Sequence, residues 1–358
     1  MTWIVFEKVG KRFGNKWTIA GLDLKIEKGE FFTLLGPSGC GKTTTLRLIA
    51  GLEIADEGKI FIAGKDVTRV PPQQRRVAMV FQNYALYPHM TVAENIAYPL
   101  KVRGVPREEQ EKKVKENARR LRIEHLLERM PNMISGGEQQ RVAVARAMVQ
   151  EPNVFLFDEP LSNLDARLRL EARRFLRRIQ KDLGITAVYV THDQAEAMAM
   201  SDRVGVMKEG RLIQIGSPEE IYLRPADIFV GSFVGNFPMN FIEGTAQAQA
   251  EKLFFQSDEF KIPLPQNLKI KTGEKLTLGI RPEHIEASSS GSAQEELNGI
   301  IEDIEQLGSE MIVSVSVAGK TLLIRHTTRA ELKTGTQAFL KIPSSSLHLF
   351  NSEGKRLN

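Results

Sequence analysis

The segment from Gly36 to Thr43 carries the clearest chemical signal, because Gly-Pro-Ser-Gly-Cys-Gly-Lys-Thr matches the pattern G-x-x-x-x-G-K-[ST]. Its glycines let backbone amides turn toward a phosphate without a side-chain clash. Lys42 adds a full positive charge, and a helix starting here adds the partial positive charge of its N-terminus. Thr43 offers a hydroxyl oxygen suited to Mg²⁺. We therefore expect these residues to bind nucleotide phosphates: Gly36, Pro37, Ser38, Gly39, Cys40, Gly41, Lys42, Thr43 and Thr44.

Two adjacent carboxylates, Asp158 and Glu159, directly follow the apolar run Val154-Phe-Leu-Phe157. In open α/β sheets, ligands bind beyond the carboxyl ends of the strands, where these two side chains should lie. We expect Asp158 to hold Mg²⁺, directly or through water. Glu159 would polarise the attacking water, a role worth about 10²–10⁴ in rate. Taken alone, the pair could equally be solvated or cap the next helix.

His192 follows another apolar run, Ala187-Val-Tyr-Val190, and should lie at the same sheet edge. A neutral imidazole there could donate a hydrogen bond to a terminal phosphate or position water. A single histidine at a strand end is more often structural, so only the neighbouring motifs favour a catalytic role.

A second anion-binding helix start is predicted at Ser135. Ser135 as N-cap and Glu138 three residues later form the pattern of a capping box. The paired glycines Gly136 and Gly137 leave the backbone amides open to an anion. One nucleotide bound within a single chain hardly needs two helix starts so far apart in sequence. A nucleotide shared between two chains would use one helix start from each chain.

A parallel α/β fold is needed to bring these residues together. We expect buried strands at residues 31–35, 154–157 and 187–190, and helices at 44–50, 135–149 and 165–183. An amphipathic helix is predicted at 107–129, within an all-helical insertion at 90–152. After Gly235 the pattern changes to short alternating strands such as Val313–Val317, with an exposed loop at 288–296.

Length and composition limit the class of protein. The 358 residues suggest about two domains, and 42% hydrophobic with 26% charged residues favours a globular rather than a disordered chain. One cysteine, Cys40, excludes an intrachain disulfide and fits a reducing compartment. No apolar run approaches the ~18 residues of a membrane-spanning helix, and the N-terminus does not resemble a secretory signal.

The net charge of +5 is concentrated on the helix predicted at 165–183. A basic helix face is most often simply solvated, and we favour that interpretation over a nucleic-acid surface. The basic residues are Arg167, Arg169, Arg173, Arg174, Arg177, Arg178 and Lys181.

The motifs together resemble the ATPase subunit of an ATP-binding cassette (ABC) importer. The segments G-P-S-G-C-G-K-T, S-G-G-x-Q, F-L-F-D-E-P, L-S-N-L-D and T-H-D follow the family's order and approximate spacing over residues 1–235. In that family two cassettes pack head to tail. The resemblance therefore implies that Ser135 to Gln139 touch the γ-phosphate bound by the other subunit, and that Ser162 to Asp165 link the two sites.

Two further roles come only from the resemblance: Phe13 would stack on adenine, and Gln82 would sense Mg²⁺ and the transmembrane partner. Without it, Phe13 is a half-buried aromatic and Gln82 a surface amide. The implied catalytic residues are Glu159, His192 and Gln82. Beyond the phosphate loop, the implied ATP-binding residues are Phe13, Ser135, Gly136, Gly137, Gln139 and Asp165, and the implied Mg²⁺ residues are Thr43, Gln82 and Asp158.

This segment departs from the family signature L-S-G-G-Q, because the chain reads Ile134-Ser-Gly-Gly-Glu138 and so has Glu138 in place of the glutamine. Glutamate preserves the capping box. It also places a carboxylate near a γ-phosphate, and we therefore expect weaker ATP-driven dimer closure than with glutamine.

The tail resembles the OB-like regulatory domain of maltose-type and related sugar or glycerol-phosphate importers. The matching stretches are Gly235-Asn-Phe-Pro-Met-Asn240-Phe, Leu278-Gly-Ile-Arg-Pro-Glu-His284 and Glu305-Gln-Leu-Gly308, and Phe81 to His89 fits the same subfamily. Beyond Phe237 the only aromatic residues are phenylalanines, which argues against a nucleic-acid platform there.

These observations predict an α/β phosphate-loop NTPase cassette over residues 1–235, with a parallel-sheet core and a helical subdomain at about 90–152. An all-β OB-like regulatory domain would follow over 236–358. The resemblance implies an ATPase that uses ATP and Mg²⁺ to energise a membrane importer of a sugar or glycerol-phosphate type. Its partners would be a second ATPase subunit (an identical chain or a paralogue), transmembrane permease subunits and, indirectly, an extracytoplasmic substrate-binding protein, with no nucleic acid. Its location would be the cytoplasmic face of the cell membrane.

Other functions stay open on the sequence alone. Importers of polyamines, iron or other solutes share a similar tail. A soluble cassette ATPase acting on translation or DNA is disfavoured by the single phosphate loop and the lack of sustained heptads. A phosphate-loop kinase or GTPase would leave the Ser135 segment unexplained, and the tail could mainly bind and restrain another protein.

Overall fold

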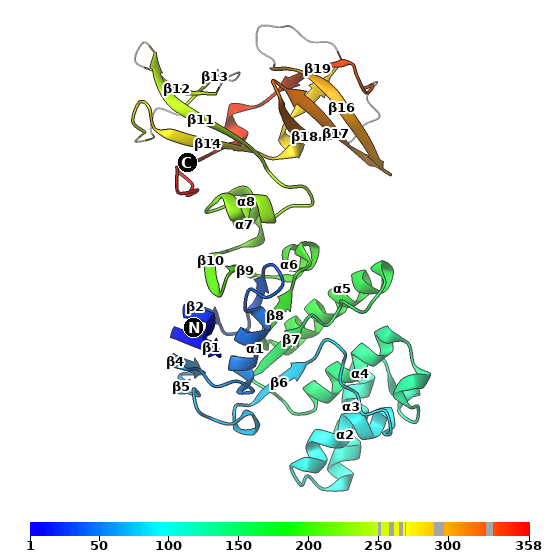
Figure 1. Cartoon of the computed structure of the whole chain (residues 1–358). Helices are drawn as coiled ribbons and strands as arrows, with labels where there is room; N and C mark the ends of the chain where they lie inside the picture. The colour runs from blue at the N-terminus through cyan, green and yellow to red at the C-terminus, as the bar shows by residue number, and fades with distance from the viewer. Residues whose placement is uncertain (250–251, 258–260, 265–267, 269, 290–296, 327–331) are drawn as a thin grey trace. The chain divides into compact units, whose positions relative to one another are not determined.

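The computed structural model describes residues 1–358 except 250–251, 258–260, 265–267, 269, 290–296 and 327–331 (Figure 1). Contacts divide the chain into two compact units, Met1–Glu220 and Ile221–Asn358. The domain boundary predicted near residue 235 stays a prediction. Most of the loop predicted at 288–296 lies outside the described residues.

A six-stranded sheet forms the centre of the first unit, in the order β10-β9-β3-β8-β7-β6. All neighbouring pairs are parallel except β9 and β10. Every residue of β3, β7 and β8 is buried, which explains their continuous apolar sequences and confirms the three predicted strands. The bounds are β3 Phe31–Leu35, β6 Val77–Val80, β7 Val154–Asp158, β8 Thr186–Thr191, β9 Arg203–Lys208 and β10 Arg211–Gly216.

The central sheet separates two hydrophobic cores. Alternate residues of β7 enter different cores, because Leu156 packs with α1 and the N-terminal strands while Phe155 packs with α4 and α5. The N-terminal strands form an antiparallel sheet in the order β2-β1-β4-β5. The bounds are β1 Thr2–Phe13, β2 Lys16–Glu27, β4 Glu57–Ile62, β5 Lys65–Asp66, α1 Lys42–Ala50, α4 Gly136–Met148, α5 Ala166–Leu183 and α6 Gln194–Met200.

The stretch between β6 and β7 is helical, as expected. It contains α2 Val92–Val102, α3 Arg107–Leu121 and α4, which Figure 1 shows as a group. The helix predicted at 107–129 is too long. Arg122 ends α3 by adopting a φ of 57°, and a short 3₁₀ turn, Glu124–Leu126, follows.

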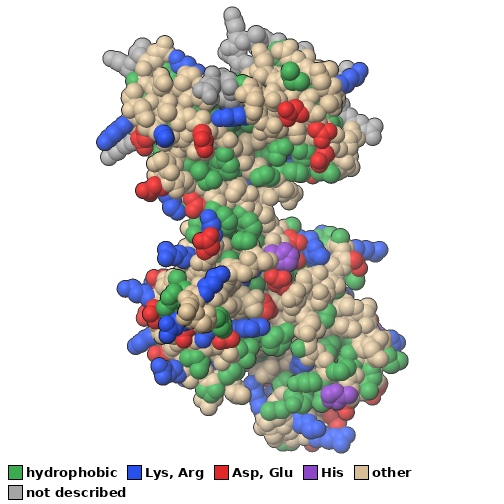
Figure 2. All heavy atoms as spheres, viewed as in Figure 1, with side chains coloured by type: hydrophobic (Ala, Val, Ile, Leu, Met, Phe, Trp, Pro, Cys, Tyr) green, Lys and Arg blue, Asp and Glu red, His purple; other side chains and the backbone are tan. Residues whose placement is uncertain are grey.

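The basic helix α5 is only partly a solvated face, which corrects the prediction. Arg167, Arg174, Arg178 and Lys181 are exposed, whereas Arg169, Arg173 and Arg177 are half-buried. Arg177 donates hydrogen bonds to Asp202 and lies over the ring of Phe31, 5.5 Å from its centroid. Long basic side chains can cover apolar surface in this way while their charged ends find partners. On the face seen in Figure 2, basic and acidic side chains are interspersed over the first unit.

A buried arginine holds the end of the helix that follows the phosphate loop. Arg75 is 3% exposed and donates hydrogen bonds to the carbonyls of Leu48 and Ile49, at 2.6 and 3.1 Å, and of Val70, at 2.7 Å. The last carbonyls of a helix lack partners within the helix, so this guanidinium completes the C-terminus of α1. Burial lowers the pKa of Arg75 from its usual value. The helix is therefore anchored at the end opposite the phosphate loop.

The second unit contains two five-stranded antiparallel sheets, β13-β12-β11-β14-β20 and β15-β19-β16-β17-β18, which share one hydrophobic core. The strand predicted at Val313–Val317 lies within β17. The strands are β11 Asn240–Gln249, β12 Lys252–Gln256, β13 Lys261–Pro263, β14 Lys275–Ile280, β15 Glu286–Ser288, β16 Leu297–Leu307, β17 Glu310–Val317, β18 Lys320–His326, β19 Gln337–Lys341 and β20 Leu347–Phe350. Helix α8 Ile228–Phe233 also belongs to this unit, whereas helix α7 Pro218–Leu223 includes residues of both units.

Arg281 joins the segment around α8 to the end of β14. It is 1% exposed and donates hydrogen bonds to the carbonyls of Gly231, Val234 and Tyr222. Burial lowers its pKa to about 10. Within the described part of the chain, no helix has both the length and the apolar character required to cross a membrane.

Candidate nucleotide-binding site

The phosphate loop connects β3 to α1 and lies against backbone on two sides. A Cβ on Gly36 would lie 2.4 Å from the carbonyl oxygen of Met207. Gly41 has a φ of 106°, and a Cβ there would lie 2.5 Å from Ile19 Cδ1 and 2.9 Å from the carbonyl oxygen of Thr18. The close approach of neighbouring atoms requires glycine at both positions, and the positive φ is a second reason for glycine at position 41. The loop shape that exposes amide groups therefore depends on these two residues.

Lys42 is buried beneath this loop. Its Nζ donates hydrogen bonds to the carbonyls of Gly36, at 2.8 Å, and Pro37, at 3.0 Å. The side chain of Cys40 is also buried, and burial raises the pKa of its thiol. A thiol of raised pKa is a poor nucleophile, which favours a role for Cys40 as a small spacer in the loop.

Thr43 and Asp158 meet at the start of α1 and the end of β7. Thr43 Oγ1 donates a hydrogen bond to Asp158 Oδ1 over 2.9 Å. Burial raises the pKa of Asp158, the Thr43 hydrogen bond lowers it, and the neighbouring Glu159 carboxylate raises it again. A buried carboxylate beside a hydroxyl oxygen is a hard donor set that a divalent cation would stabilise. These two residues therefore fit a Mg²⁺ site that is completed by phosphate oxygens and water.

Glu159 has a strained backbone with a φ of 45°. Its N–H donates to the carbonyl of Val190 over 3.0 Å, and its own carbonyl accepts from Ser162 Oγ over 2.9 Å. Such a conformation costs about 1–3 kcal/mol in a residue other than glycine and persists only when its surroundings fix it. His192 Nδ1 lies 3.0 Å from Glu159 Oε2, so the structure brings these two predicted catalytic side chains together.

The strand register explains why these groups share one edge of the sheet. Leu35 is paired with Thr191, and Asp158 with Val190, so the residues that follow β3, β7 and β8 emerge side by side. Gln82 follows the neighbouring strand β6 and is exposed. Its backbone carbonyl accepts a hydrogen bond from Asn163 Nδ2 over 3.0 Å.

Ser135 caps α4 through the predicted capping box. The backbone N–H and the hydroxyl of Ser135 donate to Glu138 Oε2, at 2.8 and 2.7 Å, and Glu138 N–H donates to Ser135 Oγ. These bonds lower the pKa of Glu138, so its carboxylate is charged at neutral pH. Gln139 lies on the first turn, and its side-chain amide donates to the carbonyl of Pro131.

The predicted nucleotide contacts outside the phosphate loop come from three other segments of the chain. Phe13 is 48% exposed at the end of β1, with Lys11 Nζ 5.2 Å from its ring centroid. Asp165 is the N-cap of α5 and accepts a hydrogen bond from Leu168 N–H. Among the residues that the structure describes, no hydrogen bond or ion pair connects Ser135–Gln139 to the phosphate loop.

A buried carboxylate near the sheet edge was not predicted. Glu196 is 3% exposed, and its Oε2 accepts hydrogen bonds from Tyr189 OH and Thr191 Oγ1, each at 2.7 Å. The spacing Asp193-x-x-Glu196 resembles a capping box, and Asp193 does cap α6. The carboxylate of Glu196 instead turns to the preceding strand, which no local pattern indicated.

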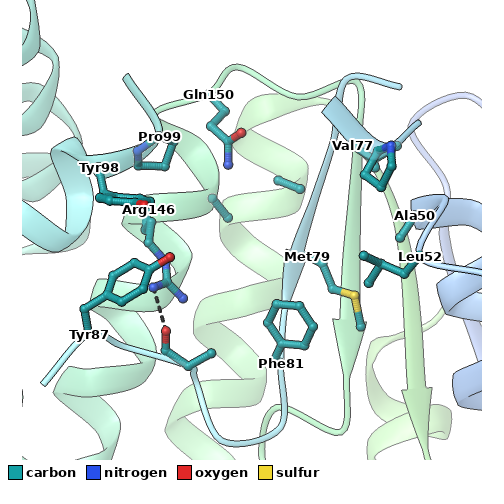
Figure 3. A pocket seen from close by; sticks show the side chains of 14 residues that line it. Ala50, Leu52, Val77, Met79, Phe81, Tyr87, Tyr98, Pro99, Arg146 and Gln150 are labelled. Atoms are coloured by element: carbon teal, nitrogen blue, oxygen red, sulfur yellow. Dashed lines mark hydrogen bonds between the residues drawn. The ribbon is translucent and has the colours of Figure 1, made fainter. Parts of the chain in front are cut away.

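A cavity of about 290 Å³ opens near Gln82, in the same unit (Figure 3). Its lining is mainly apolar and comes from β6, the segment after it, α2, α4 and the end of α1. Arg146 lies over the ring of Tyr87 and donates hydrogen bonds to the carbonyls of Ala85 and Tyr84, each at 2.7 Å. The lining residues are Ala50, Leu52, Pro72, Val77, Ala78, Met79, Phe81, Ala85, Tyr87, Tyr98, Pro99, Arg146, Ala147 and Gln150.

Family models match three parts of the chain. An ABC transporter model matches residues 19–162, a MalK OB fold domain model residues 238–285, and a TOBE domain model residues 278–350. The predicted fold class, a phosphate-loop cassette followed by an all-β OB-like domain, is confirmed.

Curated relatives match over nearly the full length. The sn-glycerol-3-phosphate import ATP-binding protein UgpC 2 of Agrobacterium fabrum is 44% identical over 100% of this chain and 95% of its own. The trehalose/maltose import ATP-binding protein MalK of Thermococcus litoralis is 44% identical over 96% of each chain. The UgpC protein of Salmonella typhi is 44% identical over 100% of both chains.

A solved structure supports the same assignment. It is a dimeric ATP-binding cassette in a post-hydrolysis state bound to ADP and Pi, which is 30% identical, with a TM-score of 0.54 over 60% of this chain and 98% of its own. Together with the full-length relatives, this match confirms the resemblance found in the sequence. The chain therefore belongs to the ABC transporter family, among its import ATP-binding proteins, and is an ATP-binding transport ATPase.

Proposed function

We propose that this ATPase energises import of a carbohydrate-type solute through closure of two chains around shared ATP. One observation carries the proposal: Thr43, Asp158, Glu159 and His192 form half of a site at the sheet edge, while Ser135 presents a second helix start elsewhere. A head-to-tail pair of chains would complete each half-site with the Ser135 segment of the other chain.

Within one half-site, each side chain has a distinct task. The amides of the phosphate loop and Lys42 bind the phosphates. Bound Mg²⁺, held by Thr43 and Asp158, would neutralise charge that develops on the phosphate oxygens. Glu159 accepts a proton from the attacking water, and His192 holds the Glu159 carboxylate in place. Phe13 is sufficiently exposed to stack on an adenine ring.

The remaining sequence-derived roles are also part of this proposal. Ser135, Gly136, Gly137 and Gln139 would contact the γ-phosphate bound to the partner chain. Asp165 ends the turn that links both sites, and Gln82 would report the state of the site to a membrane partner. The hydrogen bond from Asn163 to the Gln82 carbonyl supports this link, because it joins the two segments directly.

The cavity beside Gln82 would receive a short cytoplasmic helix of a permease subunit. Apolar helix faces bind in grooves of this kind through a few anchoring side chains. The curated relatives are import ATP-binding proteins, which implies permease partners. With membrane partners of this kind, the chain would lie at the cytoplasmic face of the membrane. An extracytoplasmic substrate-binding protein would act indirectly.

The proposed cargo class follows from the relatives. Their names specify glycerol-3-phosphate, trehalose or maltose, and sulfoquinovosyl glycerol. Because relatives with different cargoes have similar sequence identity to this chain, we propose a sugar or a polyol phosphate as the cargo without naming one. Uptake assays of the assembled importer with such solutes test this class, and uptake of only polyamines or iron would contradict it.

Glu159→Gln should slow ATP hydrolysis by about 100-fold or more, because glutamine cannot accept the proton from water. ATP binding should remain, since the phosphate loop is unchanged. The variant should therefore accumulate as an ATP-bound dimer, measured by size-exclusion chromatography and nucleotide retention. Near-normal turnover would exclude Glu159 as the base.

Glu138→Gln should strengthen ATP-driven closure, because it removes a carboxylate from the neighbourhood of the γ-phosphate while keeping an acceptor for Ser135. Two like charges about 4 Å apart in water repel by ~1 kcal/mol, so the ATP concentration for half-maximal hydrolysis should fall about 5-fold. The exposed Glu124→Gln is the matched control. Unchanged ATP affinity and turnover in Glu138→Gln would contradict the effect.

Leu52→Glu should weaken binding of the permease, because it adds a charge at a half-exposed apolar position of the cavity. Co-purification of the permease subunits with the chain should fall about 10-fold. Full recovery of the permease with this variant would show that the helix binds elsewhere.

A further inference from the structure

Arg169, on the first turns of α5, contacts two segments that are distant in sequence. Its Nη2 donates a hydrogen bond to the carbonyl of Leu164 over 3.1 Å. Its Nη1 lies 3.4 Å from Asp193 Oδ2, and its Nε lies 4.0 Å from Glu196 Oε1. The guanidinium is only partly exposed, so solvent screens these contacts less than it screens a surface pair.

The first contact holds the turn before α5. Leu164 belongs to the segment 162–165, in which Ser162 Oγ donates to the carbonyl of Glu159 and Asn163 to that of Gln82. Displacement of this turn would therefore disturb the strained backbone of Glu159 as well as the position of Gln82.

The other contacts hold the turn that carries His192. Asp193 is the N-cap of α6, with its Oδ1 accepting from Glu196 N–H, and its own N–H donates to Thr191 Oγ1 over 2.9 Å. Glu196 is buried and also accepts from Thr191. His192 lies between two residues that this network fixes.

Glu196 is a buried carboxylate that the nearby charge of Arg169 helps to stabilise. Its carboxylate is almost fully buried, and burial raises the pKa of Glu196 above the usual value. The hydrogen bonds from Tyr189 and Thr191 and the positive charge of Arg169 each lower the pKa of Glu196 again, so they offset part of the cost of burying the ion. Arg169, one of three half-buried arginines of α5, is the basic residue whose Nε lies 4.0 Å from Glu196 Oε1.

We propose that Arg169 is a positioning residue for ATP hydrolysis, which locks the Leu164 turn to the His192 turn. It holds Glu159 and His192 in their mutual geometry without touching ATP. The planar guanidinium is required, because its Nη1 and Nη2 groups reach Asp193 and the Leu164 carbonyl at once while its charge stays 4.0 Å from Glu196; a lysine ammonium is a single charged point. The role rests on the proposed function of Glu159 and His192.

The first experiment compares three variants of the full chain. Arg169→Met should lower kcat for ATP hydrolysis about 10-fold with KM for ATP within ~2-fold, because small misplacements of catalytic groups affect turnover while the phosphate loop is untouched. Arg169→Lys should recover part of kcat by restoring the charge. Arg174→Met, which removes an exposed arginine of the same helix, should behave as wild type.

A double-mutant cycle separates positioning from general destabilisation. Asp193→Asn keeps the Oδ1 acceptor that caps α6 and weakens the pair with Arg169. If both residues act through one contact, the double variant should be no slower than Arg169→Met alone. Wild-type kcat in Arg169→Met, additive losses in the cycle, or a loss of kcat matched by an equal rise in KM would overturn the proposal.

The test of Arg169 does not depend on the folding of one variant or on the identity of the cargo. If Arg169→Met does not fold, kcat and KM of Arg169→Lys and Asp193→Asn decide in the same way, with wild-type values in both counting against the proposal. All rates are for ATP hydrolysis and do not depend on cargo. A chain that hydrolyses ATP but imports no carbohydrate would contradict the proposed cargo and leave the outcome for Arg169 valid.

Discussion

The hydrogen bond between Thr43 and Asp158 joins the start of α1 to the end of β7, and the nucleotide site that we propose is arranged around it. This hydrogen bond can form only if β3 and β7 end at the same edge of a parallel sheet and the phosphate loop connects β3 to α1. Glycine at 36 and 41 permits the loop to pass close to neighbouring backbone. Arg75 holds the far end of α1. The position of the donor hydroxyl is therefore fixed from both ends of the helix.

A second set of contacts holds the segments around Glu159, Gln82 and His192, which we propose respond to ATP. Glu159 keeps a strained backbone because hydrogen bonds from its N–H and to its carbonyl fix it. The segment 162–165 contacts Glu159, the Gln82 carbonyl and, through Arg169, the His192 turn. Leu164 of this segment packs in the hydrophobic core, and polar contacts connect the segment to Glu159, Gln82 and the His192 turn. Such contacts suit a site that must open and close, because they can be exchanged for contacts to nucleotide or to a second chain.

Sequence reasoning predicted the features whose partners lie close in the chain. The phosphate loop, the capping box of Ser135 and Glu138, and the buried strands all depend on local spacing, and each has the expected structure. The end of α3 at Arg122 was missed because a non-glycine residue in the left-handed region leaves no sequence signal. The buried state of Glu196 and the contacts of Arg169 depend on segments that meet only in the folded chain, so no periodicity could reveal them. The roles of Phe13 and Gln82 came from resemblance alone.

The central claim is that each ATP lies between the phosphate loop of one chain and the Ser135 segment of another. The most direct test is disulfide cross-linking of Ser38→Cys with Ser135→Cys in one chain that also carries Cys40→Ala. Ser38 and Ser135 are both exposed, so the new thiols are accessible. The account predicts a covalent dimer that forms with ATP and is absent without it. Failure to form that dimer in the presence of ATP, or a cross-link confined to a single chain, would contradict the claim.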